Sequence, residues 1–183
     1  MTPWQCRQAI NVIQSGGVIA YPTETVYGLG CDPLDYAAVA RICALKQRPL
    51  SKGLILLASD VSQLLPFIQV NASQQKKLRT RQPRPTTWIV PASDSCPSWL
   101  TGQHPGIAVR ITDHLVIECL CTDLGHPLVS TSANPAGKQP ALNALKIISM
   151  FGNNIDYVIH DRLDTGSSPS TIRDIKSGET LRT

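Results

Sequence analysis

The sequence predicts a single α/β domain built around a mixed β-sheet. Its 183 residues fit one domain, and 42% of them are hydrophobic, which is enough to build a full core. Short apolar runs alternate with segments whose apolar residues recur at helical spacing. No internal repeat, low-complexity tract or linker interrupts this alternation, so we expect residues 1–183 to form one domain.

Four segments have the caps and the apolar spacing of helices. Thr2 and Pro3 fit an N-cap and a first helical residue, and that helix is expected to end before Gly16. Asp35 fits the N-cap of a second helix, whose apolar side chains share one face as far as Leu45. Two further helices are expected from Ser59 to Phe67 and from Asp113 to about Leu124.

Short apolar runs bounded by turn residues predict the strands. Residues 54–58 form a continuous run between Gly53 and Ser59, which is typical of a strand buried on both faces. Residues 22–30 combine hydroxyls, one carboxylate and glycines, and are expected to form a loop. The other expected strands cover residues 18–21, 86–90, 107–111, 128–130 and 157–160, with two closing strands at 170–172 and 180–182.

Charge and composition narrow the class of ligand. The net charge of +4 and the pI of about 8.8 suit an anionic ligand, but they are far from the balance of a nucleic-acid coat protein. No apolar run approaches the length of a membrane span, and the N-terminus lacks a basic segment followed by an apolar core. We therefore expect a cytoplasmic protein.

The cysteines and histidines do not form a metal-binding pattern. The six cysteines contain no CxxC pair, and the four histidines have no HxxxH spacing. Without export signals or paired spacing, reduced and mostly buried thiols are expected instead of disulfides or a zinc site. We predict no structural metal.

A basic loop precedes the strand at 54–58. Lys46, Arg48 and Lys52 lie close together, and Pro49 fixes its own φ and keeps Arg48 away from the helical region. Such an ordered loop can present fixed positive charge to a phosphate. The segment alone fits a solvated charge cluster at a strand entrance equally well.

A second segment rich in hydroxyls follows the strand at 128–130. Residues 130–134 (Ser-Thr-Ser-Ala-Asn) could aim short donors at a phosphate or a small polar ligand, although capping of backbone groups is their usual role. The sequence contains no GxSxG, GxxxxGK[ST] or GxGxxG motif. This inventory favours catalysis by positioning and charge stabilisation, as in attack at a phosphorus centre.

Four motifs occur together and in order. They are Tyr21–Gly30 (YPTETVYGLG), Lys46–Pro49 (KQRP), Ser130–Asn134 (STSAN) and Ser170–Ile172 (STI). With these motifs, the chain resembles the YrdC-like family, the threonylcarbamoyl-AMP synthases of tRNA modification, from about residue 8 to Arg182. The resemblance implies a twisted mixed sheet with helices packed around it and a basic concave face.

The resemblance also implies a reaction. Members of the family are nucleotidyltransferases that convert L-threonine, bicarbonate and ATP, with Mg²⁺, into threonylcarbamoyl-adenylate and pyrophosphate. Partner proteins then transfer the threonylcarbamoyl group to adenosine 37 of tRNAs that read ANN codons. Because the carbamate and the α-phosphate are both anions, their charges must be neutralised and their atoms held in line.

The matching positions imply two sets of site residues and two catalytic cations. Arg110 resembles an arginine that holds the threonine carboxylate, whereas without the family match it would be a surface arginine at a strand end. Lys46 and Arg48 are the residues expected to act in catalysis. Threonine binding is expected of Thr25, Arg110, Ser130 and Ser170. ATP binding is expected of Arg48, Lys52, Ser132, Asn134 and Arg182.

Two positions depart from the family pattern. Pro83-Arg84-Pro85 stands where many relatives have Pro-Gly-Pro, so the loop differs or Arg84 adds charge at the mouth of the site. Lys52 stands where longer relatives often have asparagine, which leaves the geometry of its phosphate contact open.

An RNA-binding module is the alternative function. It would use the basic run at 76–84 and the loop at 46–52 as one concave patch. Against it, the basic run lacks interleaved aromatic residues for base stacking, and only 5% of the chain is aromatic. Phosphate contacts alone would give salt-sensitive binding of low specificity.

Overall fold

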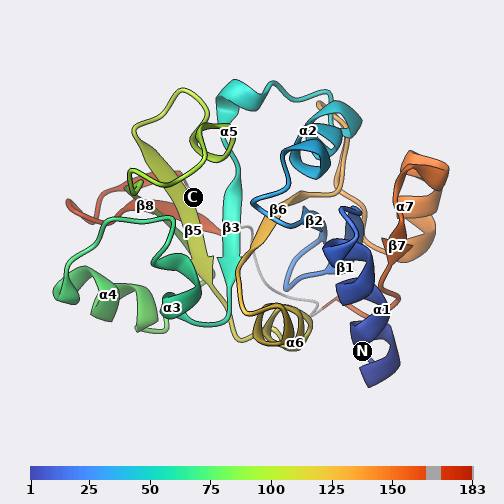
Figure 1. The fold of residues 1–183 in the computed structure, drawn as a ribbon, viewed down its shortest axis with the longest axis horizontal. Coiled ribbons are helices and arrows are strands. Elements are labelled where there is room, and N and C mark those ends of the chain that lie inside the picture. The colour runs from blue at the N-terminus through green and yellow to red at the C-terminus, as the bar shows by residue number, and fades with distance from the viewer. Residues whose placement is uncertain (164–169, 183) are drawn as a thin grey trace.

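The structure, a computed structural model, describes residues 1–163 and 170–182 and consists of a mixed sheet with helices packed around it (Figure 1). The strands are β1 (Ile19–Pro22), β2 (Tyr27–Cys31), β3 (Ile55–Ala58), β4 (Thr86–Pro91), β5 (Gly106–Ile111), β6 (Leu128–Ser132), β7 (Tyr157–Val158), β8 (Thr171–Asp174) and β9 (Thr180–Arg182). The α-helices are α1 (Pro3–Gln14), α2 (Tyr36–Leu45), α3 (Val61–Leu64), α4 (Ala72–Arg79), α5 (Ser98–Thr101), α6 (Leu115–Leu124) and α7 (Ala144–Phe151). Two 3₁₀ turns, η1 (Leu50–Lys52) and η2 (Gly152–Asn154), complete the described elements.

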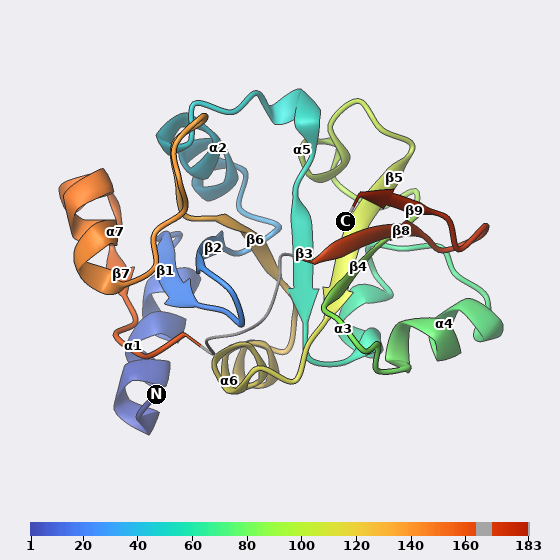
Figure 2. The ribbon, with the colours of Figure 1, turned by 180° about the vertical axis from the view of Figure 1, so that it is seen from behind.

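The strands of the described residues form one sheet in the order β7-β1-β2-β6-β3-β5-β4-β8-β9. The pairs β1/β7, β3/β5 and β4/β8 are parallel, and the other neighbours are antiparallel. Viewed from behind, β7 and α7 lie at one edge of the sheet and β8 and β9 at the other (Figure 2). The predicted α/β class with a mixed sheet is therefore confirmed.

The sheet separates two apolar clusters. On one face, Leu29, Leu56 and Val109 belong to the larger cluster, which also includes residues of α2 and α3. On the other face, Tyr21 and Leu57 belong to a smaller cluster whose helical members come from α1 and α6. Because side chains alternate along a strand, Leu56 and Leu57 serve opposite faces, as predicted for a strand buried on both sides.

The expectation of a loop at 22–30 is wrong for the second half of this segment, which forms strand β2. Glycine makes a strand less expected, because it has no side chain to pack and loses more backbone entropy on folding than any other residue. In β2, however, every residue is buried, and the pairing with β1 and β6 places Gly28 and Gly30 in the middle of the sheet.

The helix expected at 59–67 is shorter than predicted. Its regular part, α3, runs from Val61 to Leu64, because Pro66 has no N–H with which to continue the helical hydrogen bonds. The helices α4, α5 and α7 were not predicted. In α4 Leu78 is the buried residue, so its apolar pattern is too sparse to reveal a helix.

The expectation that all cysteines are reduced is also wrong. A disulfide joins Cys6 on α1 to Cys119 on α6 across 113 positions of sequence, where no local spacing could indicate a pair. The two helices pack against each other in the smaller cluster, which brings the sulfurs together. The free cysteines are Cys31, Cys43, Cys96 and Cys121, and burial raises the pKa of each thiol above its ordinary value.

Two further observations concern metals and membranes. Among the described residues, the group close enough to share a metal ion is Cys6, Cys119 and Asp123, and two of its members are joined in the disulfide. In the same part of the chain, no helix is both long and apolar enough for a membrane crossing.

We predict that Cys119→Ser lowers the stability of the oxidised protein. The disulfide closes a long loop and so restricts the unfolded chain, and we expect a loss of about 2–4 kcal/mol in the free energy of unfolding. Denaturant unfolding with and without reductant measures this. Cys96→Ser, which removes a free thiol, is the control. Equal stability of Cys119→Ser and the unreduced wild type would contradict the prediction.

Candidate active site

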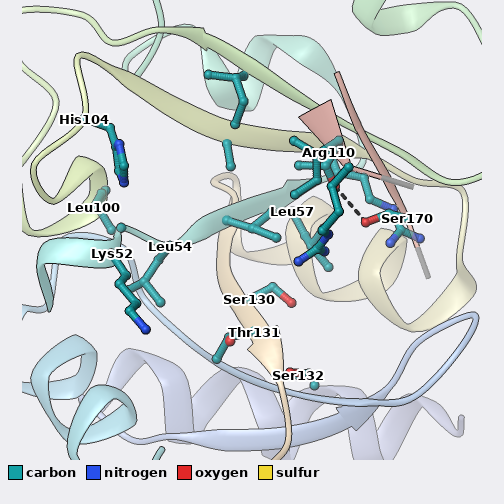
Figure 3. Close-up of a pocket in the computed structure, with 18 of the residues that line it drawn as sticks. Lys52, Leu54, Leu57, Leu100, His104, Arg110, Ser130, Thr131, Ser132 and Ser170 are labelled. Atoms are coloured by element: carbon teal, nitrogen blue, oxygen red, sulfur yellow. Dashed lines mark hydrogen bonds between the residues drawn. The ribbon is translucent and has the colours of Figure 1, made fainter. Parts of the chain in front are cut away.

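A cavity of about 590 Å³ lies on the sheet face that α1 and α6 cover elsewhere. Its floor is made by alternate residues of neighbouring strands, including Ile55 and Leu57 of β3 and Ala108 of β5. Leu54 and Leu100 add apolar surface at one end (Figure 3). This apolar floor was not predicted, because a continuous run such as 54–58 does not show which of its side chains face a ligand.

The rim of the cavity is polar and basic. Apart from Lys46 and Asn134, all the predicted site residues line it. In Figure 3, Lys52 and His104 lie at one end of the cavity and Arg110 and Ser170 at the other, with Ser130 and Ser132 along β6. The structure thus brings together residues that are distant in the sequence. Further polar residues line the cavity that were not assigned to the site from the sequence: Thr87, Thr101 and His104, together with Thr23 and Thr131 of the two hydroxyl-rich segments.

The basic loop is ordered by its own hydrogen bonds. Gln47, just after the end of α2, has a φ of 51°, a left-handed conformation common just beyond helix ends. Nη2 of Arg48 donates to the carbonyl oxygens of Lys52 (3.2 Å) and Gly53 (3.0 Å). The guanidinium therefore spans the loop around η1 while it lines the cavity.

Lys46 supports the hydroxyl-rich turn and does not line the cavity. Its side chain is 5% exposed, and Nζ donates to the carbonyl oxygens of Ser132 and of Asn134 (2.9 Å). Within the turn, Oγ of Ser132 donates to Oδ1 of Asn134 at 2.7 Å. Nδ2 of Asn134 donates to the carbonyl oxygens of Pro135 and Lys138. Lys46 and Asn134 thus lie behind the cavity wall, where they fix the position of Ser132.

Arg110 is held by a carboxylate of the first motif. The residue lies near the end of β5, is 8% exposed, and pairs through Nη2 with Oε2 of Glu24 at 2.5 Å. Oγ1 of Thr112 donates to the other carboxylate oxygen at 2.5 Å. Burial alone would raise the pKa of Glu24, but the Arg110 charge and the Thr112 hydrogen bond bring it below its ordinary value. Glu24 was noted in the sequence as the loop's carboxylate but was not assigned a role.

Two hydroxyl pairs complete the rim. Oγ of Ser170 and Oγ1 of Thr87 are 3.0 Å apart and hydrogen-bonded, which ties the start of β8 to β4 (Figure 3). The Tyr21 hydroxyl donates to Oγ of Ser130 at 2.7 Å. Small hydroxyl side chains are thus fixed at opposite sides of one cavity that also contains cations, a combination suited to a ligand with both phosphate and carboxylate groups.

A family model described as telomere recombination, that of the Sua5/YciO/YrdC domain, matches residues 11–183. The chain belongs to the Sua5/YciO/YrdC family. One relative, the threonylcarbamoyl-AMP synthase of Nitrosococcus oceani, is 47% identical over 98% of this chain and 97% of its own length. The resemblance to the YrdC-like family that the motifs indicated is therefore confirmed.

Solved structures of the Sua5/YciO/YrdC family share the fold. P. abyssi Sua5 in complex with L-threonine has a TM-score of 0.88 and 31% identity over 98% of this chain, which spans about half (53%) of that longer protein. E. coli YciO has a TM-score of 0.81 and 27% identity over 97% of this chain and 90% of its own.

Pro83-Arg84-Pro85, where many relatives have Pro-Gly-Pro, does not line the cavity described above. Arg84 lines a second cavity, also of about 590 Å³, together with Arg79 and Arg81 of the basic run. Arg110 lines both cavities and so stands between them. The basic run and the basic loop therefore border different cavities, and the expected basic concave face remains a prediction.

Proposed function

We propose that this protein is a threonylcarbamoyl-AMP synthase, which forms L-threonylcarbamoyladenylate and pyrophosphate from L-threonine, bicarbonate and ATP. The observation that carries the proposal is one cavity lined by Arg48, Lys52, Arg110 and Arg182, in a chain 47% identical to a synthase over nearly its whole length. The product serves the N6-threonylcarbamoylation of adenosine 37 in tRNAs that read ANN codons. We further propose that residues 1–183 form one catalytic domain and act in the cytoplasm.

We assign the two substrates to different ends of the cavity. We assign the nucleotide to the end with the basic loop, where Arg48 and Lys52 present positive charge, and to Arg182 on β9. Ser132, held by Asn134 and Lys46 from behind, faces the same ligand. We assign threonine to the end with Thr25, Arg110, Ser130 and Ser170.

The reaction requires no covalent nucleophile from the protein. The carbamate oxygen of the carboxylated threonine attacks the α-phosphorus of ATP, an O–P bond forms, and pyrophosphate leaves with the electrons of the broken P–O bond. Both reactants are anions, so the fixed cations lower the barrier by stabilising the charge that develops on the phosphate oxygens. The class that fits this chemistry is nucleotidyltransferase.

Mg²⁺ is expected to enter with ATP. The described residues that line the cavity include no carboxylate, whereas Mg²⁺ in proteins usually has one or two among its ligands. These described lining residues therefore offer the ion no carboxylate ligand, and we assign no step to it. Proteins that transfer the threonylcarbamoyl group to tRNA are the expected partners.

The test of the proposal is a direct assay. The protein is incubated with labelled bicarbonate, ATP, Mg²⁺ and L-threonine, and pyrophosphate and labelled adenylate are measured. Product that depends on threonine is the expected result. Failure to form the adenylate under these conditions, with a folded protein, would count decisively against the proposed function.

RNA binding by the basic run is the second candidate function, favoured by the arginines that border the second cavity. A triple variant, Arg79→Ala with Arg81→Ala and Arg84→Ala, separates the two functions. If the synthase function is the main one, this variant keeps the wild-type rate of adenylate formation. Loss of both RNA binding and adenylate formation would mean that the two cavities act together.

The ionisation of Lys46 predicts how ATP binding changes with pH. Burial, followed by the neighbouring Arg48 charge, lowers the pKa of Lys46 from 10.5 to about 8. We expect the KM for ATP to rise as the pH passes through 8, because the wall beside the nucleotide loses a positive charge. Lys46→Arg keeps its charge at these pH values and is the control.

The stability of the fold should improve over the same rise in pH that weakens ATP binding. Between pH 8 and 10.5 the unfolded chain holds the Lys46 proton more strongly than the folded chain does. The contribution of this group to the free energy of unfolding therefore increases as the pH rises. For the prediction about ATP binding, the contradicting result is a KM for ATP that depends on pH in the same way in Lys46→Arg and in the wild type, because another group would then be titrating.

A further inference from the structure

The buried Tyr21 reaches across the sheet to a residue of the cavity. It lies on β1 and is completely buried, yet its hydroxyl contacts Ser130 on β6, and β2 runs between these two strands. In the register, Tyr21 is paired with Gly28, and Gly30 is paired with Ser130. The tyrosine ring therefore crosses β2 diagonally.

The glycines of β2 make this crossing possible. A Cβ atom on Gly28 would lie 3.3 Å from two ring carbons of Tyr21, which is tighter than ordinary contact. A Cβ atom on Gly30 would lie 2.7 Å from a ring carbon and 3.3 Å from the phenol oxygen. Any larger side chain at Gly30 would displace the ring, so the Gly-Leu-Gly sequence of β2 is explained by the close approach of Tyr21.

The direction of the hydrogen bond determines what Ser130 can do. The phenol donates to Oγ of Ser130 at 2.7 Å, and burial keeps the phenol protonated by raising its pKa above the ordinary value. A serine hydroxyl has one proton to donate and two lone pairs. Since Tyr21 occupies a lone pair, the Ser130 proton is left for another acceptor.

The Ser130 side chain faces the cavity. It is 7% exposed and lines the cavity, and Figure 3 shows it on the same side of β6 as Arg110. An anionic oxygen is the acceptor that a fixed O–H donor beside a guanidinium suits best.

We propose that Tyr21 is a positioning residue, which orients the Ser130 hydroxyl as a hydrogen-bond donor to an anionic oxygen of the amino-acid substrate. The inference rests on the proposed function for the identity of that substrate. Tyr21 itself does not line the cavity, so it acts through Ser130.

Tyr21→Phe tests the inference, because it keeps the ring and removes the donor. We expect the dissociation constant for L-threonine, measured by calorimetry, to rise about three- to tenfold, the range for one hydrogen bond. The KM for ATP should stay unchanged. Tyr27→Phe is the matched control: Tyr27 is 1% exposed, and its hydroxyl bonds to the carbonyl oxygens of Ile159 and Asp161, outside the cavity.

A double-mutant cycle separates positioning from general stability. If Tyr21 acts through Ser130, Tyr21→Phe should weaken threonine binding in the wild type but not in the Ser130→Ala background. The same loss in both backgrounds, or an equal loss of threonine and ATP binding, would overturn the inference. If Tyr21→Phe does not fold, wild-type threonine affinity in Ser130→Ala alone would overturn it.

Threonine binding distinguishes this inference from the proposed function. A protein that binds threonine and shows the expected cycle, but forms no adenylate, would overturn the proposed function and support the role of Tyr21. A wild type that does not bind threonine, alone or with ATP present, would overturn both.

Discussion

Arg48→Ala is expected to slow adenylate formation by about 10²- to 10³-fold, the usual cost of removing a fixed group that stabilises charge in a transition state. Arg48 lines the cavity while two backbone carbonyls hold its guanidinium in place. The charge is therefore already oriented before the reaction, and little of its effect is lost to reorganisation. Single-turnover measurements at saturating ATP give the rate.

The same variant should lose only a little stability. The two hydrogen bonds of Arg48 close a surface loop and not part of the core. Arg48→Lys keeps the charge but cannot span both carbonyls and a phosphate, so we expect an intermediate rate. Arg7→Ala, on the exposed side of α1, is the control for the loss of one positive charge. Unfolding of Arg48→Ala at the assay temperature would show that the residue is structural.

Arg110→Ala is expected to abolish threonine binding and to destabilise the fold. The substitution removes the positive charge beside Glu24, which stays partly buried and ionised while Thr112 still donates a hydrogen bond to it. Breaking a buried ion pair by removing one partner costs about 3–5 kcal/mol. Denaturant unfolding at neutral pH and calorimetric titration with L-threonine measure the two effects.

Removing the second charge separates these effects. Adding Glu24→Gln to Arg110→Ala eliminates the uncompensated carboxylate, so stability should recover in part while threonine binding stays lost.

Because the folded-state pKa of Glu24 is below its ordinary value, the ion pair stabilises the wild type above pH 4.5, and this contribution is lost as the pH falls through the folded-state pKa. Undiminished threonine affinity in Arg110→Ala would contradict the assigned role.

The sequence was most informative where one residue type has one local role. Asp35 caps α2 through the backbone N–H of Ala38, as predicted from its place before an apolar helical face. Strand β2 was missed because its glycines serve a contact with Tyr21, a residue of another strand. The disulfide was missed for the same reason, since Cys6 and Cys119 meet only when α1 packs on α6. Long-range packing leaves no trace in a local pattern.

The candidate site shows the same limit. The motifs indicated the residues around the cavity but not which side chains enter it. Lys46 and Asn134 share motifs with Arg48 and Ser132, yet they bond behind the wall, which only the fold determines. The apolar floor, for example Leu57 and Ala108, could not be distinguished from core because both use the same residue types.

The position of β8 and β9 has a consequence for how the protein becomes active during synthesis. Ile172, Leu181 and Arg182 form part of the cavity wall, and these strands leave the ribosome after every other strand of the described sheet. A nascent chain that has folded as far as β6 already contains Arg48, Arg110 and Ser130, but its cavity is open on the side of β4. The wall of the cavity on this side forms when β8 pairs with β4, so we expect the proposed binding of ATP to begin only after β8 and β9 have been synthesised.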